Sequence, residues 1–370
     1  MANNIYTSKV FVNEEMKKAV NEVFDYGMFT MGQKTAEFED KFAKFIGSKF
    51  AVACINGTVA IELVLQSLGI KRDDEIIVPS HTAFPTIEPI LQLGAKPVFV
   101  EINEKTYTLD PKELENKITN KTKAIIPVHI YGNPADLDSI KEICEQNNIL
   151  LIEDCCQAHN AEYKGKKVGT IGIAGCFSFY PSKNMTVCGE GGMIITDNEE
   201  LYQKCKKLLN HGQEGTYNHV FLGHNYRLSE IHCAIGIKQL ELLNSFTERR
   251  REIAKLYTEN LKETSLILPQ ESEYARHTYH LYVVRTEADK RDKIIEELKK
   301  ENIYCGIHYP IACHQQKVIK EMISLPITEK VVDEIISLPT YPLLTDEEVI
   351  MISNKLKRIL NTYKGDLFDN

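Results

Sequence analysis

Short runs rich in β-branched residues alternate with helical stretches from residue 50 to about residue 200, and this alternation constrains the fold most. Strands of this kind, separated by helices, form right-handed βαβ units around a largely parallel, buried sheet. We therefore expect an α/β fold. The predicted strands cover residues 50–55, 75–79, 97–101, 124–129, 149–154, 175–180 and 192–196. The predicted helices between them cover residues 58–68, 86–93, 111–118 and 136–147.

A second, smaller unit is predicted after this region. The length of 370 residues suggests two domains. Apolar residues recur at helical spacing from Ser229 to about Leu261, which predicts a long helix that connects the two domains. We place a large domain with N-terminal helices at residues 1–245 and a small C-terminal α+β domain at residues 246–370. The small domain is expected to contain strands at 279–285 and 303–309, a helix at 289–301 and a final helix from Asp346.

Charge and hydropathy exclude several classes of protein. The chain has 44 Lys and Arg against 52 Asp and Glu, a net charge of −8, and no dense basic block. We therefore expect no nucleic-acid partner. No apolar run approaches the roughly 18 residues of a membrane-spanning helix, and the N-terminal residues lack the pattern of a signal peptide. The sequence predicts a cytoplasmic protein with no membrane partner.

The ten cysteines are expected to be free thiols rather than disulfides or metal ligands. Cys54 and Cys233 lie in apolar contexts, where a thiol behaves as a small buried hydrophobe. No Cys-x-x-Cys pair occurs, and the adjacent pair Cys155 and Cys156 is poorly arranged to chelate zinc. We predict no metal site.

The segment Asn56-Gly57-Thr58 joins the first predicted strand to its helix. Open α/β sheets bind ligands beyond the carboxyl ends of their strands. A glycine, a hydroxyl and the free amides of a helix N-terminus suit a phosphate there. Taken alone, the segment is more often a turn glycine followed by a threonine N-cap.

Two charged residues follow other predicted strands. Asp154 ends an apolar strand, and a carboxylate buried there needs a partner such as a protonated heterocyclic nitrogen. A loop carboxylate that reaches solvent is an equal alternative. Lys183 lies between an aromatic strand and the glycine-rich turn at 189–192. Partial desolvation would make its amine a usable nucleophile, although most lysines are solvated surface charges. Ser178 could add a hydroxyl to the phosphate site.

These groups are the ones that pyridoxal 5′-phosphate requires. A lysine bonds to its aldehyde, a carboxylate keeps its pyridine nitrogen protonated, and the ring accepts electrons from the substrate carbanion. The chain closely resembles the DegT/DnrJ/EryC1/StrS family of sugar aminotransferases, which are PLP-dependent transferases of the aspartate aminotransferase-like fold (fold type I). The matching segments are residues 56–58, 78–82, 127–132, 153–159, 177–184, 189–192, 223–227 and 338–342.

The resemblance implies roles for individual residues. Lys183 matches the lysine that bonds to the cofactor, Asp154 the partner of the pyridine nitrogen, and Gln157 the residue beside the phenolic oxygen. Gly57, Thr58 and Ser178 match phosphate ligands. Asn225 matches an asparagine that reaches the cofactor of the neighbouring subunit, so a homodimer with shared sites is implied.

Three positions leave alternatives open. Many family members place a cofactor-stacking aromatic residue directly after the threonine equivalent to Thr82, but here Ala83 follows, then Phe84, the candidate for that contact. His308, with Tyr309 beside it, resembles a substrate-side position, although a loop histidine is also commonplace. Arg227 could bind a nucleotide diphosphate or the carboxylate of the donor, or it could be a surface charge.

The predicted function is amino transfer from L-glutamate to a nucleotide-linked 3- or 4-keto sugar in amino-sugar biosynthesis. One alternative is a regulatory or binding protein that retains the fold without turnover. Another is a PLP-dependent sugar dehydratase, which the presence of Lys183 disfavours because that branch of the family has histidine instead.

Overall fold

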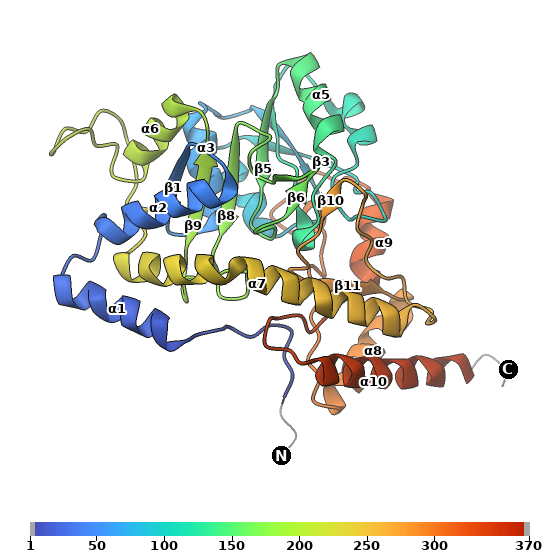
Figure 1. Cartoon of the computed structure of the whole chain (residues 1–370). Helices are drawn as coiled ribbons and strands as arrows, with labels where there is room; N and C mark the ends of the chain where they lie inside the picture. Colours follow the sequence, from blue (N-terminus) through green and yellow to red (C-terminus); the bar gives the residue numbers. More distant parts are fainter. Residues whose placement is uncertain (1–3, 366–370) are drawn as a thin grey trace.

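A seven-stranded, mostly parallel sheet forms the centre of the larger unit (Figure 1). The computed structural model describes residues 4–365. The strand order is β1-β9-β8-β5-β4-β2-β3, and β9 alone runs antiparallel to both of its neighbours. The α/β prediction is confirmed. The strands are β1 (Phe50–Cys54), β2 (Glu75–Pro79), β3 (Lys96–Val100), β4 (Thr122–Ile125), β5 (Leu150–Asp154), β8 (Ala174–Ser178) and β9 (Gly192–Thr196).

Helices cover both faces of this sheet, because strand residues alternate between two apolar cores. Val52 and Cys54 of β1 pack in the core that α3 covers. Ala51 and Ala53 pack in the core that α2 and α7 cover. The helices of this unit are α1 (Glu14–Tyr26), α2 (Gln33–Ile46), α3 (Gly57–Ser67), α4 (Glu88–Gln92), α5 (Leu137–Asn147) and α6 (Glu199–Leu208).

The helix α7 (Glu230–Leu261) runs without interruption along the molecule to the smaller unit (Figure 1). There an antiparallel pair, β11 (Tyr282–Arg285) and β12 (Ile335–Leu338), packs with α8 (Ala288–Lys300), α9 (Pro326–Glu334) and α10 (Asp346–Gly365). A further small sheet contains β6 (Glu162–Tyr163), β7 (Lys166–Lys167) and β10 (Ala275–Arg276). The predicted domain division at residues 245 and 246 falls within α7 and remains a prediction.

Two predicted elements are wrong. Residues 303–309 do not form a strand, because the segment makes only single bridges, at Ile303 and at Gly306, and the partner of β11 is β12 instead. Residues 111–118 form two short 3₁₀ turns, Pro111–Glu113 and Glu115–Lys117, rather than a helix. The backbone becomes extended again at Ile118, which ends the second turn.

The helices α6 and α9 were not predicted. No helix in the described range 4–365 is both long and apolar enough to span a membrane.

A buried carboxylate joins α7 to the N-terminal helices. Glu230 is fully buried and accepts hydrogen bonds from the backbone N–H groups of Gly32, Lys34 and Thr35 at 2.8–2.9 Å. The Tyr26 hydroxyl donates to it at 2.8 Å, and the Thr35 hydroxyl also donates. Burial alone would raise the pKa of Glu230, but the hydrogen bonds outweigh burial and lower it.

Glu230→Gln is therefore expected to destabilise the protein by about 1.5–3 kcal/mol at pH 7, the usual range for hydrogen bonds to a charged group. Urea unfolding measures this difference. Because the folded pKa is lowered, the carboxylate stabilises the fold above the ordinary glutamate pKa of about 4.3. That contribution is lost as the pH falls through the folded pKa, so the difference between the two proteins should shrink there. The exposed Glu241→Gln, on the same helix, is the control and should change stability by less than about 0.5 kcal/mol.

Candidate active site

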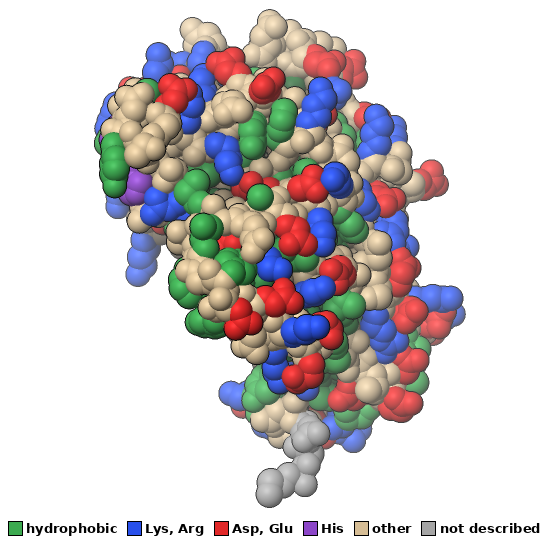
Figure 2. Space-filling model, turned by 60° about the vertical axis from the view of Figure 1, so that its left-hand side comes forward, with side chains coloured by type: hydrophobic (Ala, Val, Ile, Leu, Met, Phe, Trp, Pro, Cys, Tyr) green, Lys and Arg blue, Asp and Glu red, His purple; other side chains and the backbone are tan. Residues whose placement is uncertain are grey.

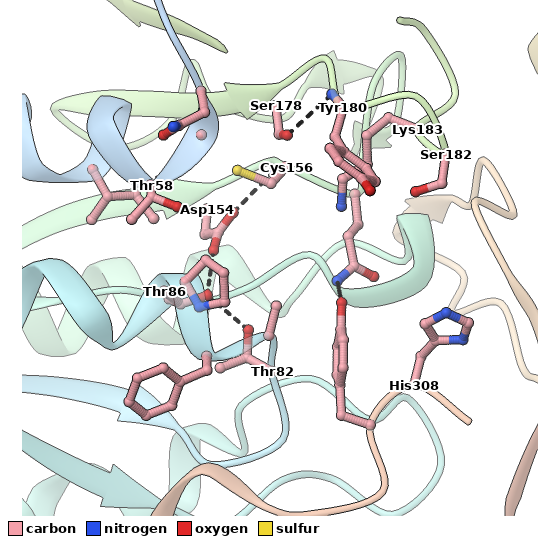
Figure 3. Close-up of a pocket in the computed structure, with 18 of the residues that line it drawn as sticks. Thr58, Thr82, Thr86, Asp154, Cys156, Ser178, Tyr180, Ser182, Lys183 and His308 are labelled. Atoms are coloured by element: carbon pink, nitrogen blue, oxygen red, sulfur yellow. Dashed lines mark hydrogen bonds between the residues drawn. The ribbon is translucent and has the colours of Figure 1, made fainter. Parts of the chain in front are cut away.

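A cavity of about 700 Å³ opens beyond the carboxyl ends of β1, β2, β5 and β8 (Figure 3). Nine of the residues predicted to form a site line it, although they come from distant parts of the chain. They are Gly57, Thr58, Phe84, Asp154, Gln157, Ser178, Lys183, His308 and Tyr309.

The first edge of the cavity is the N-terminus of α3. The N-cap is Asn56, whose side chain accepts from the Val59 N–H at 2.8 Å, so the alternative of a threonine cap at Thr58 is wrong. A side chain on Gly57 would place its Cβ 2.7 Å from Cys156 Sγ and 2.8 Å from Ser178 Cβ. Only glycine allows this close approach, and it leaves a cradle between the helix amides, Thr58 and Ser178 that fits a phosphate.

Asp154 lies at the centre of the cavity wall (Figure 3) and is only 3% exposed. Its Oδ2 accepts from the Thr86 hydroxyl at 2.8 Å, and its Oδ1 accepts from the Cys156 N–H at 3.0 Å. Thr86 is in turn 2.9 Å from the Thr82 hydroxyl. No Lys, Arg or His within residues 4–365 forms an ion pair with Asp154, so the carboxylate is oriented but not neutralised. A protonated pyridine nitrogen fits that requirement.

Lys183 follows β8 in a tight turn, where its N–H donates to the Tyr180 carbonyl at 2.9 Å. The side chain reaches the cavity (Figure 3). Desolvation lowers the pKa of Lys183, although the nearby Cys156 and Asp154 oppose this effect. A lowered pKa raises the fraction of neutral amine, the form that attacks a carbonyl carbon.

The amide of Gln157 is fixed at both ends. Its oxygen accepts from the Tyr131 N–H at 2.9 Å, and its nitrogen donates to the Tyr309 hydroxyl at 3.1 Å. One amide hydrogen of Gln157 remains for a ligand. Burial, with the charge of Asp154, raises the pKa of Tyr309, so the phenol keeps its proton and can donate it.

Several residues that line the cavity were not predicted as site residues. They include Thr82, Thr86, Cys156, Tyr180, Ser182 and Glu190. Thr86 follows the carboxyl end of β2, so the position of that strand end could have indicated it. Ala83 and Phe84 both line the cavity, and Phe84 also packs on the apolar core. The contact of Phe84 with the cofactor ring remains a prediction.

Asn225 and Arg227 do not line this cavity. Asn225 is exposed, in the loop before α7. Arg227 donates to the Asn210 side chain at 2.5 Å. If these two residues act on a cofactor or substrate, they must do so in another subunit.

One group in the described chain has the composition of a metal site: His129, Glu153 and Cys155. Its carboxylate already accepts from the N–H groups of Gly169, Ile171 and Gly172 at 2.7–2.8 Å. His129 is hydrogen-bonded at both ring nitrogens, to Glu153 and to the Ala135 N–H, each at 3.1 Å. We interpret the group as a structural network, because the hydrogen-bonding groups of Glu153 and His129 are already satisfied without a metal ion.

The fold and this site define a transferase that uses pyridoxal 5′-phosphate. Residues 11–357 match the model of the DegT/DnrJ/EryC1/StrS aminotransferase family, and the chain belongs to this family. It is therefore an aminotransferase, as predicted.

Named relatives act on nucleotide sugars. The chain is 40% identical to dTDP-3-amino-3,6-dideoxy-alpha-D-galactopyranose transaminase of Aneurinibacillus thermoaerophilus, over 85% of this chain and 87% of that protein. It is 38% identical to GDP-perosamine synthase of Escherichia coli O157:H7, over 92% and 94%. Among solved structures, the PLP-form of the putative sugar aminotransferase Spr1654 from Streptococcus pneumoniae superposes with a TM-score of 0.93. That structure is 29% identical, over 97% of this chain and 99% of that one.

Thr86→Val is expected to weaken cofactor binding about tenfold, because Asp154 loses a charge-assisted hydrogen bond that orients it. Absorbance titration of the apoenzyme with pyridoxal 5′-phosphate measures the change. Thr82→Val removes only the next hydroxyl in the chain and should have a smaller effect. Equal losses in the two variants would contradict a direct role for Thr86.

Proposed function

We propose that this aminotransferase moves the amino group of L-glutamate to a nucleotide-linked 3- or 4-keto sugar in amino-sugar biosynthesis. The observation that carries the proposal is the convergence of Lys183 and the un-neutralised Asp154 on one cavity beside the Gly57 cradle. The names of the relatives support a nucleotide sugar as acceptor.

The cofactor would be held by groups already oriented. Asp154 would hold a proton at the pyridine nitrogen, and Gln157 would donate to the phenolic oxygen. Gly57, Thr58 and Ser178 would bind the phosphate. When bound, pyridoxal 5′-phosphate supplies the electron sink that stabilises a carbanion at the amino-bearing carbon.

Lys183 is the proposed base. Lys183 Nζ would hold the cofactor covalently and, when free, would take a proton from the donor carbon. Its lowered pKa increases the fraction of neutral Nζ, the form that accepts a proton. Because one cavity serves both substrates in turn, the kinetics should be ping-pong.

A binding role without turnover would need neither a desolvated lysine nor an oriented, un-neutralised carboxylate. A dehydratase would use the same cofactor but eliminate water. Mass spectrometry of the sugar product separates dehydration from amino transfer.

We further propose that the protein is a homodimer with shared sites. Asn225 lies outside the cavity of its own chain, and its loop exposes Val220, Phe221 and Leu222. The turn between α1 and α2 exposes Met28, Phe29 and Met31. Hydrophobic side chains gather on the face of the molecule that contains this loop and this turn (Figure 2). Exposed apolar patches are typical of interfaces, and a second copy of this chain would cover this one.

The ten cysteines are all unpaired. Free thiols in this number are typical of a reducing compartment. This supports the proposal that the protein works in the cytoplasm.

L-Glutamate is expected to convert the yellow holoenzyme to its pyridoxamine form, which then aminates one member of a panel of dTDP-, UDP- and GDP-linked 3-keto and 4-keto sugars. Lys183→Ala should abolish both half-reactions while the phosphate site still binds cofactor non-covalently. Absorbance spectra and product mass spectrometry are the measurements. Conversion by Lys183→Ala at the wild-type rate would refute the role of the lysine, and no conversion by any of several amino donors would favour a binding protein.

Asn225→Ala should weaken cofactor binding by about one to two orders of magnitude, because a hydrogen bond to a charged acceptor contributes roughly 1.5–3 kcal/mol. Mixing it with Lys183→Ala tests the shared site. In a mixed dimer one site carries both lesions and the other neither, so activity should return after subunit exchange. If mixed dimers form and Asn225→Ala is severely impaired, yet no activity returns, Asn225 does not act across the interface.

A further inference from the structure

The segment that places His308 at the cavity is hydrogen-bonded to the buried strand β12. The Gly306 N–H donates to the Ser337 carbonyl at 3.1 Å, and the Ser337 N–H donates to the Gly306 carbonyl at 2.8 Å. Ser337 belongs to β12 and is fully buried. The backbone two residues before His308 is therefore anchored to the core of the smaller unit.

A side-chain hydrogen bond then fixes the imidazole. His308 Nδ1 lies 2.9 Å from Ser337 Oγ. A side chain at position 306 would place its Cβ 2.7 Å from His308 Cε1, so Gly306 leaves the space in which the ring sits against Ser337. Within residues 4–365, His308 Nε2 has no hydrogen-bond partner, and His308 lines the cavity.

Electrostatics keep this ring uncharged. Burial, with the charge of Lys183, lowers the pKa of His308 to about 4. A neutral imidazole has one donor and one acceptor nitrogen. Since Ser337 occupies Nδ1, the nitrogen that remains for a ligand is Nε2.

The position of His308 indicates which ligand it meets. Thr58 and Ser178, at the proposed phosphate end, lie at the other side of the cavity, whereas His308 lies on the side of Lys183 and Ser182 (Figure 3). With the cofactor phosphate bound at Thr58 and Ser178, His308 would face the part of the cavity left for the acceptor.

We propose that Ser337 is a positioning residue that sets the orientation of the His308 ring, so that Nε2 hydrogen-bonds the keto sugar. This inference rests on the proposed function. Ser337 itself touches neither cofactor nor substrate, because its hydroxyl is buried behind the ring.

Ser337→Thr and Ser337→Val are a matched pair for the test, since both are β-branched and suit a strand, but only threonine keeps a hydroxyl. With the pyridoxamine form of each enzyme and the keto sugar that wild type converts from the panel, Ser337→Val should lower kcat/KM about tenfold, mainly through KM. Ser337→Thr should restore most of it. The half-reaction with L-glutamate should stay within about twofold in both variants.

Two kinetic outcomes would overturn the proposal. One is wild-type kcat/KM for the sugar in folded Ser337→Val. The other is equal impairment of both variants, which would indicate strand packing rather than the hydroxyl. If wild type converts no sugar of the panel, the proposed function fails instead.

A measurement without substrate distinguishes failure of the positioning role of Ser337 from failure of the proposed function. Ring-nitrogen NMR of the ¹⁵N-histidine-labelled holoenzyme at pH 7, with His308→Gln to assign the signals, reports the hydrogen bonding of Nδ1 directly. Wild type and Ser337→Thr should show the same Nδ1 shift at His308, and Ser337→Val, which lacks the hydroxyl, should show a different one. Identical shifts in wild type and Ser337→Val would refute the positioning role whatever the substrate is.

Discussion

Two neighbouring carboxylates at the end of β5 organise both the fold and the site. Successive strand residues face opposite sides of a sheet. Glu153 points into the structure, where three backbone N–H groups and His129 satisfy it. Asp154 points into the cavity, where only a hydroxyl and one N–H hold it. A buried carboxylate without an ion pair is costly. The fold thus stabilises one charge internally and leaves the other to a ligand.

The sheet topology converts this local feature into a site. Because β1, β2, β5 and β8 all end at the same edge, the residues that follow them meet although they lie far apart in the sequence. The smaller unit contributes His308 and Tyr309 to the same cavity. Both units therefore have to be in place before the cavity is complete, and the continuous helix α7 connects them.

Site residues could be predicted from the sequence where their chemistry is evident from the neighbouring residues. Lys183 and Asp154 follow recognisable strands, so their convergence follows from the predicted parallel sheet. Thr86 was missed because its bond to Asp154 joins residues 68 positions apart. Residues 303–309 have an extended, apolar pattern, but whether such a segment pairs depends on a partner that local sequence does not specify, and here β12 pairs with β11. Asn56 and Thr58, two positions apart, are both suitable N-cap residues, and the backbone geometry that selects Asn56 is not evident from the sequence.

Charge links the site to the proposed dimer. Among the described residues that line the cavity, Lys183 is the sole lysine or arginine, and His308 is neutral near pH 7. A cofactor phosphate and a nucleotide diphosphate are both strongly anionic. The α3 N-terminus supplies only a partial positive charge, and Lys183 would be bonded to the cofactor. We therefore expect a second source of hydrogen-bond donors and positive charge at the mouth of the cavity. Asn225 and Arg227, which lie outside their own cavity, have that chemistry, and a second copy of the chain is the simplest way to bring them there.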